Sequence, residues 1–232
     1  MITQLSQRRS TLLRTFSSSL VVAVLIVTVV PVGVAQDISV GGRIEPGAGW
    51  ISGSDWEDAV DFFDDNRAGE PSKPALTFAG GLAAAFGFAP GFAVQVEVAV
   101  SNLGGNYGYT AFGIDVDGKQ RATLLQVPVL LKPRIQTAGG DFFFLLGPTV
   151  GIFLTDVATE ESGGGITVEG DSEPDNQIIA GIVLAVGHEW EVGTGYLGVD
   201  LRYTRQLTDT FEDFNSRQNV VGLGISYLQR VR

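Results

Sequence analysis

Eight charged residues stand at alternate positions within apolar segments, where ionic side chains are unusual. Four are basic and four acidic: Arg43, Glu45, Glu97, Lys132, Arg134, Glu189, Asp200 and Arg202. Such a set can form an ion-pair network in a packed interior, because buried charges must be paired. It can also line a narrow path for ions if water lies beside the same residues. We favour the packed network, and we expect Asp200 to pair with Arg202 or Lys132.

An enzyme is harder to support from these residues. Ser-His-acid catalysis needs a histidine beside a nucleophile, and His188 is the single histidine of the chain. Alternation from Ile178 to Val186 places it on the apolar face, next to Trp190. We expect these two rings to belong to an aromatic belt at a membrane interface. The sequence therefore predicts no catalytic residues, and a lipid-modifying enzyme is the least favoured alternative.

Metal and cofactor signals are equally weak. Asp115-Val116-Asp117-Gly118 resembles the start of a calcium loop but lacks its distal glutamate. Without cysteine and with one histidine, the chain has no ordinary zinc site. Gly163-Gly164-Gly165 is followed by no lysine and no helical pattern, so it predicts a flexible loop tip. We expect no metal and no cofactor.

The charged residues lie in segments with the two-residue period of β-strands. From Phe92 to Val100, large apolar residues alternate with small, polar or charged ones. A soluble core would not accept full charges on one face, whereas a barrel that is apolar outside and polar inside does. We predict an all-β, eight-stranded antiparallel up-and-down transmembrane β-barrel with strands over 38–52, 74–88, 91–103, 121–135, 142–154, 177–191, 195–206 and 218–228.

Short and long connections alternate between these strands, as in barrels with tight periplasmic turns and longer outward loops. The long ones are 53–73, 104–120, 155–176 and 207–217, and they hold 19 of the 26 acidic residues. Acidic outward loops could attract cations, bridge divalent ions to glycolipid, or reflect general surface acidity. In the first loop, Ser54 and Glu57 have the spacing of a helix capping box.

Residues 1–36 resemble a signal peptide. Arg8, Arg9 and Arg14 precede an apolar stretch, and small residues favour cleavage near Ala35 and Gln36. The rival interpretation is a membrane anchor, but the stretch is shorter than the ~20 residues of a spanning helix. We expect export to the bacterial outer membrane and a barrel domain over residues 37–232.

The charge balance limits the partners. Without the three arginines of the signal, 12 basic residues remain against 26 acidic ones, a net charge of about −14. Nucleic acid is therefore excluded as a partner, since its phosphates require a basic surface. We expect contact with outer-membrane lipid, with periplasmic chaperones and with the barrel-insertion machinery during assembly. We further expect a monomer, with an unidentified protein as a candidate partner at the outer loops.

Three segments resemble the PorT-like outer-membrane β-barrel family. They are Leu124-Leu125-Gln126-Val127-Pro128-Val129-Leu130-Leu131-Lys132, Gly147-Pro148 with Gly151, and Asp200-Leu201-Arg202-Tyr203. The resemblance implies an outer-membrane location and an eight-stranded barrel, but no agreed activity. One departure is the chain end, where Tyr227 is followed by five further residues instead of closing the barrel as a terminal aromatic residue.

Three functions follow as hypotheses. The first is an integral barrel with a structural or interaction role, a packed charged interior and acidic loops. The second is a narrow cation-preferring pore. The third is a periplasmic lipocalin-like barrel, which would carry apolar residues inside and charged residues outside. The predicted arrangement is the reverse, because Glu97, Lys132 and Asp200 lie on the inward face and rows of valine and leucine lie on the outward face.

Overall fold

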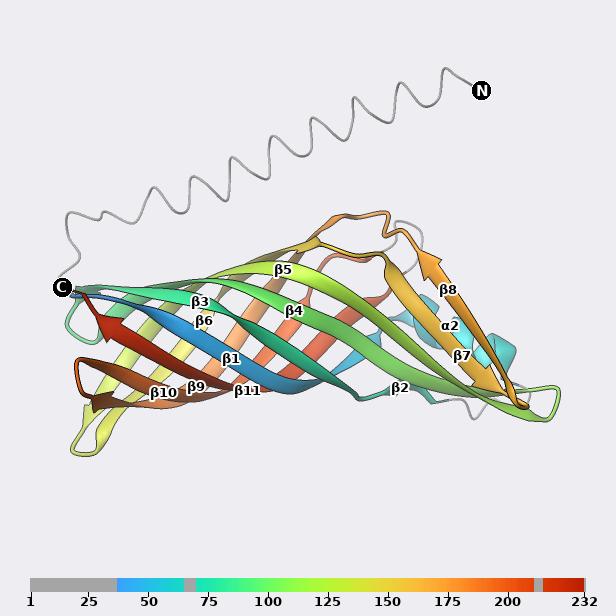
Figure 1. The fold of residues 1–232 in the computed structure, drawn as a ribbon, viewed down its shortest axis with the longest axis horizontal. Coiled ribbons are helices and arrows are strands. Elements are labelled where there is room, and N and C mark those ends of the chain that lie inside the picture. The colour runs from blue at the N-terminus through green and yellow to red at the C-terminus, as the bar shows by residue number, and fades with distance from the viewer. Residues whose placement is uncertain (1–36, 65–69, 211–214, 232) are drawn as a thin grey trace, which may run out of the picture. The chain divides into compact units, whose positions relative to one another are not determined.

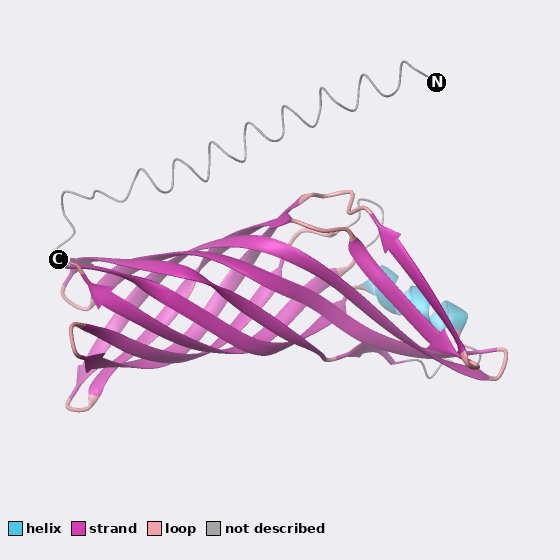
Figure 2. Ribbon diagram, in the orientation of Figure 1, coloured by secondary structure: helices cyan, strands magenta, loops and turns pink. Residues whose placement is uncertain are grey.

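The computed structural model describes residues 37–64, 70–210 and 215–231. The predicted signal segment 1–36 lies outside them. The described residues form one helix and eleven strands (Figures 1 and 2). In chain order they are β1 (Asp37–Ser52), α2 (Ser54–Phe63), β2 (Glu70–Lys73), β3 (Ala75–Ala89), β4 (Phe92–Ala111), β5 (Ile114–Thr137), β6 (Gly140–Phe153), β7 (Val157–Gly163), β8 (Ile166–Ser172), β9 (Ile178–Val192), β10 (Gly195–Gln206) and β11 (Arg217–Arg230).

All strands belong to one antiparallel sheet. Its order is β2-β4-β3-β1-β11-β10-β9-β6-β5-β7-β8, and β4 additionally pairs with β5 from Phe92↔Pro133 to Ala111↔Ile114. Most neighbours in the sheet are also neighbours along the chain, as expected for an up-and-down arrangement. The predicted all-β, antiparallel up-and-down class is therefore confirmed.

The strand count differs from the predicted eight. The three further strands β2, β7 and β8 lie in segments 53–73 and 155–176, which we expected to be loops. Segment 104–120 is also not a loop, because β4 and β5 continue through it. Glycines and polar residues, such as Gly104-Gly105-Asn106, interrupt the apolar alternation there. Tyr107 is buried in this segment, but one buried aromatic side chain is too little to produce an alternating pattern.

Two tight turns complete these extended hairpins. Phe112 and Gly113, which join β4 to β5, have φ angles of 53° and 73°. Gly164 and Gly165, which join β7 to β8, have φ angles of 58° and 82°. Positive φ at both central residues matches the right-handed twist of the flanking strands. The predicted flexible glycine tip is therefore a hairpin turn.

Phe112→Gly is expected to stabilise the β4–β5 hairpin by about 1 kcal/mol, because phenylalanine is strained in the left-handed region. Its side chain is 95% exposed, so little packing is lost. Hydrogen exchange of the hairpin amides in detergent micelles measures the effect. Ala111→Gly, at the neighbouring position in the strand, should weaken the same hairpin. Faster exchange in the Phe112 variant would contradict the strain argument.

The short helix α2 forms where a helix was expected, but its start differs from the prediction. Gly53 is the N-cap residue, and no side chain caps the helix. The predicted capping box of Ser54 and Glu57 is therefore wrong. The helix is instead held by its apolar side: Val60 is buried, and Trp56 packs edge-on against Tyr107 of β4.

The two ends of the sheet differ. Short turns join β3 to β4, β5 to β6 and β9 to β10, and lie at the end where β1 begins and β11 finishes (Figure 1). The opposite end carries α2, β2, β7 and β8. No helix in the described part of the chain is long and apolar enough to cross a membrane.

Many large apolar residues of the long strands face outward. Along β10, Leu201 is 57% exposed, while its neighbour Asp200 is 2% exposed. Large exposed apolar side chains recur on the other long strands: Val40, Ile44, Phe78, Leu82, Val98, Val100, Leu131, Ile135, Phe144, Leu146, Leu184, Val186, Leu223 and Ile225. A continuous belt of this kind is typical of a surface in contact with lipid.

Candidate functional site: a buried ion-pair network

Each of the eight long strands contributes at least one polar side chain to the buried face of the sheet. They are Ser39, Arg43 and Glu45 on β1, Thr77 on β3, Gln95, Glu97 and Ser101 on β4, Lys132 on β5, Thr149 on β6, Glu189 on β9, Asp200 and Arg202 on β10, and Asn219 on β11. The two-residue period of the strands produces this division, since every second side chain points to the same face.

Arg43 lies at the centre of the larger cluster. Its two terminal nitrogens donate to the carboxylate of Asp200, over 2.6 and 3.1 Å. It also donates to Glu45 Oε2 over 2.6 Å. This paired geometry matches the fork of the guanidinium group, which makes such contacts strong and specific in orientation. Arg43 thereby ties β1 to β10.

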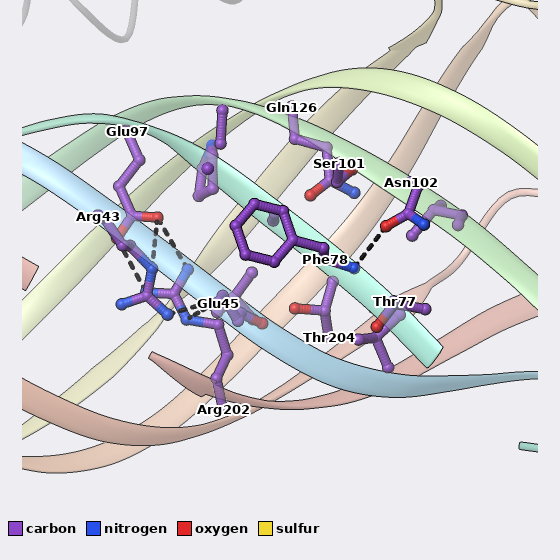
Figure 3. A pocket seen from close by; sticks show the side chains of 17 residues that line it. Arg43, Glu45, Thr77, Phe78, Glu97, Ser101, Asn102, Gln126, Arg202 and Thr204 are labelled. Atoms are coloured by element: carbon purple, nitrogen blue, oxygen red, sulfur yellow. Dashed lines mark hydrogen bonds and ion pairs between the residues drawn. The ribbon is translucent and has the colours of Figure 1, made fainter. Parts of the chain in front are cut away.

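Arg202 makes the second bidentate contact. Its terminal nitrogens donate to both carboxylate oxygens of Glu97 over 2.8 Å each, and Gln95 donates to Glu97 Oε1 over 2.7 Å. Glu97 also lies 3.8 Å from Arg43 Nε (Figure 3). The Arg43–Asp200 and Arg202–Glu97 pairs therefore form one cluster. Together with Glu45, this cluster contains two guanidinium groups and three carboxylates.

A smaller cluster surrounds Glu189. Lys132 Nζ donates to Glu189 Oε2 over 2.5 Å, and Arg134 lies 3.6 Å from Glu189 Oε1. The ammonium group of Lys132 also lies 4.5 Å from the ring centroid of Phe143, within range of a cation–π contact. This cluster has one excess positive charge and the larger one has one excess negative charge. The eight residues are therefore balanced together.

One predicted partner is wrong. Lys132 binds Glu189 and not Asp200, whose principal partner is Arg43. Arg202 does approach Asp200, with Nε 3.5 Å from Oδ1. Arg43 and Asp200 are 157 residues apart in the chain. Alternation indicates which side chains share the interior, but it does not give the register that decides which of them meet.

Two apolar clusters on the buried face were not predicted from the sequence, whose alternation indicated a polar inner face. One consists of Leu103, Leu124, Ile179 and Val220. The other consists of Leu130, Phe143, Leu145 and Val183. The sequence does contain an indication of these clusters. Leu124 and Leu130 are separated from Gln126 and Lys132 by even numbers of residues along the predicted strand, so their side chains point to the same face. The buried face is thus partly filled by apolar side chains.

Small cavities remain between these groups. One of about 30 Å³ is lined by Arg43, Glu97, Thr77 and Ser101, among others (Figure 3). Another of about 20 Å³ is lined by Thr149, among others. The hydroxyls of Thr77, Ser101 and Thr149 are buried and have no partner among the described residues. Each cavity is large enough for a water molecule, and these hydroxyls offer it hydrogen bonds. The enclosed space therefore suits isolated waters.

A wider space of about 720 Å³ lies at the short-turn end, lined by Asp37, Arg134, Asp141, Glu189, Trp190 and Tyr196, among others. A cavity of about 10 Å³ beside Lys132 shares Arg134, Glu189 and Tyr196 with the lining of this space. In the described part of the chain, no group of three or more acidic or histidine side chains is placed to hold a metal ion.

The aromatic residues proposed for an interface belt lie together near the same end. The His188 ring packs between Phe142 and Trp190, with centroids 4.6 Å from each. Phe142 and Trp190 are both exposed. No buried nucleophile is bonded to the histidine among the described contacts. The arrangement is that of an amphipathic aromatic cluster on the outer face of a strand.

Comparison with solved structures finds, among others, three proteins of low sequence identity. OprG from Pseudomonas aeruginosa is 13% identical, with 85% of this chain and 97% of that chain covered and a TM-score of 0.48. Neisserial surface protein A is 14% identical, with 81% of this chain and 95% of that chain covered and a TM-score of 0.39. Ail, the attachment invasion locus protein of Yersinia pestis, is 14% identical, with 82% and 99% covered and a TM-score of 0.35. No curated protein matches the chain.

A family model gives the assignment. The model described as "Outer membrane protein beta-barrel domain" matches residues 56–212, which is more than half of the chain. The matched range includes β3 to β10, and with them six of the eight charged residues of the buried network. The chain therefore belongs to the outer membrane protein β-barrel domain family and is located in the bacterial outer membrane.

Proposed function

We propose that eight of the eleven strands close into a transmembrane barrel. The supporting observation is a circuit of pairings through β4, β3, β1, β11, β10, β9, β6 and β5, which returns to β4 through the β4–β5 pairing. The remaining strands β2, β7 and β8 then extend the sheet beyond the barrel at the end opposite the short turns. Closure removes unpaired strand edges from the lipid, where they would be costly.

Within this barrel, the proposed role is structural or interactive, with a sealed interior. The observation that carries this proposal is the balanced ion-pair network, together with the apolar clusters beside it. An ion would have to displace Arg43 or Arg202 from its carboxylate partners, which leaves charges buried and unpaired. A conducting path would also need to join cavities of about 30 and 20 Å³ across Leu103 and Val220, which line both.

The segment Leu124–Lys132 forms the core of β5, which supports a PorT-like origin within the family. We propose no catalytic activity, since the ring neighbours of His188 are aromatic residues. The proposed partners are outer-membrane lipid, the chaperones and insertion machinery of barrel assembly, and a protein at the acidic outer end. The barrel is proposed to be a monomer.

Conductance in a planar lipid bilayer tests the sealed interior. Refolded protein should give no steady single-channel current. Leu103→Ser combined with Val220→Ser should increase ion leakage, because these substitutions open the apolar boundary that lines both cavities. Circular dichroism verifies that both proteins are folded. A steady, cation-preferring current from the unaltered protein would overturn the proposal in favour of a narrow pore.

A further inference from the structure

At the end opposite the short turns, β2, β7 and β8 extend the sheet on either side of the paired ends of β4 and β5 (Figure 1). In the described part of the chain, β2 pairs only with β4, and β8 pairs only with β7. This sheet therefore has two edges. An exposed edge carries unpaired N–H and C=O groups that can accept a strand from another chain.

The two edges are built differently. Strand β2 has four residues, includes Pro71 and Lys73, and shows a register shift against β4. Proline, lysine, irregular register and short length all block the addition of a further strand. Strand β8 has seven residues, contains no proline or lysine, and keeps an unbroken register with β7 from Val157↔Ser172 to Gly163↔Ile166. The β8 edge alone lacks these protections.

The two faces of β8 carry different side chains. Ile166 and Val168 occupy one face and are 68% and 62% exposed. Glu169 and Asp171 occupy the other face and are also exposed. The strand thus combines a row of β-branched apolar side chains with a row of carboxylates, on a segment whose seven residues are all exposed.

The hairpin that bears this edge is held firmly on the sheet. Strand β7 pairs with β5 from Val116↔Gly163 to Arg121↔Ala158. Tyr107 donates to Glu161 over 2.8 Å, and Lys119 donates to Glu160 over 2.9 Å. Burial raises the pKa of Tyr107, so its hydroxyl remains a hydrogen-bond donor at physiological pH. A partner strand would therefore meet an ordered edge and incur little cost of ordering it.

We propose that the β8 edge binds an extended segment of a partner protein in which apolar and basic residues alternate. The proposal rests on the topology of the proposed function, which places β8 outside the membrane. Backbone groups of β8 would supply the affinity, as in other cases of strand addition. Apolar residues of the segment would lie beside Ile166 and Val168. Its basic residues would lie beside Glu169 and Asp171, because opposite charges on neighbouring strands are favourable.

A second copy of this chain fits the edge less well. Pairing of two β8 strands would bring the carboxylates of Glu169 and Asp171 beside those of the other copy, and like charges on neighbouring strands repel. The same face already carries Glu160 directly opposite Glu169 within the hairpin. Charge complementarity therefore selects a basic strand.

The probe is a blocked nine-residue peptide of alternating lysine and valine. Fluorescence anisotropy measures its binding to the refolded full barrel in neutral detergent micelles. Hydrogen exchange measures the protection of the β8 amides in the complex. Two control peptides carry the same lysines and valines in separate blocks, or glutamate in place of lysine. We expect the alternating peptide to bind and to protect residues 166–172, and we expect the controls to bind at least tenfold more weakly.

The matched variants separate a specific edge from general charge. Glu169→Lys with Asp171→Lys should weaken the alternating peptide at least tenfold. Asp141→Lys with Glu191→Lys makes the same change in net charge at the short-turn end and should leave binding within twofold. Equal binding by both variants, equal loss in both, or binding without protection of β8 would overturn the proposal. The conductance measurement does not depend on peptide binding. The proposal of a sealed barrel and the proposal of a binding edge can therefore be contradicted independently.

Discussion

Replacing Arg202 by methionine is expected to lower the free energy of unfolding by about 3–5 kcal/mol, because removal of one member of a buried ion pair leaves its partner uncompensated. Three carboxylates, those of Glu45, Glu97 and Asp200, would then share the guanidinium group of Arg43. Methionine keeps most of the side-chain volume, so the decrease in stability results from the missing charge and not from a cavity. Urea unfolding of the barrel in lipid vesicles measures it.

A double-mutant cycle supplies the control for this prediction. Glu97→Met alone should also destabilise, because Arg202 loses the carboxylate that it contacts through both terminal nitrogens. The double variant replaces the pair by two apolar side chains and should be more stable than the Arg202 variant alone. Additive losses would show that the two side chains do not act as a pair.

Leu201→Arg should prevent or strongly reduce membrane assembly. Leu201 pairs with Val186 of β9 and Leu223 of β11, which are both exposed, so it lies within the apolar belt. A charged side chain facing lipid near the bilayer midplane costs about 2–4 kcal/mol. The shift in electrophoretic mobility on heating distinguishes folded barrel from unfolded chain after refolding into vesicles.

Leu207→Arg is the matched control. Leu207 has a similar exposure of 50% but follows the last residue of β10, at the end of the barrel that carries the long connections. The same substitution near an interface costs about 0–1 kcal/mol, so this variant should assemble. Normal assembly of the Leu201 variant would contradict the assignment of this face to lipid.

Several features of the fold could be predicted because they depend on periodicity alone. Alternation located the long strands and assigned Glu97, Lys132 and Asp200 to the buried face before any contact was known. It also placed His188 beside Trp190 on the outward side. These are local consequences of a strand conformation, in which successive side chains point to opposite faces.

Other features depend on contacts between distant segments. Arg202 and Glu97 are 105 residues apart, and their meeting depends on strand register around the sheet. The extensions of β4 and β5 are stabilised by their pairing with each other and with β7, and by the packing of Tyr107 against Trp56 of α2. Strand β8 is exposed along its whole length, so its sequence has no buried residue to mark it as a strand.

The most direct test of the account is an accessibility scan in lipid vesicles. The chain contains no cysteine, so single cysteines can be introduced along β4 from Phe92 to Ser101 and spin-labelled without background. Labels at Phe92, Val98 and Val100 should collide with membrane-dissolved oxygen but not with a water-soluble nickel complex. Labels at Ala93, Ala99 and Ser101 should be shielded from oxygen, which gives a period of two. A scan without this alternation, or with the nickel complex reaching the valine positions, would contradict a barrel that is apolar outside and charged within.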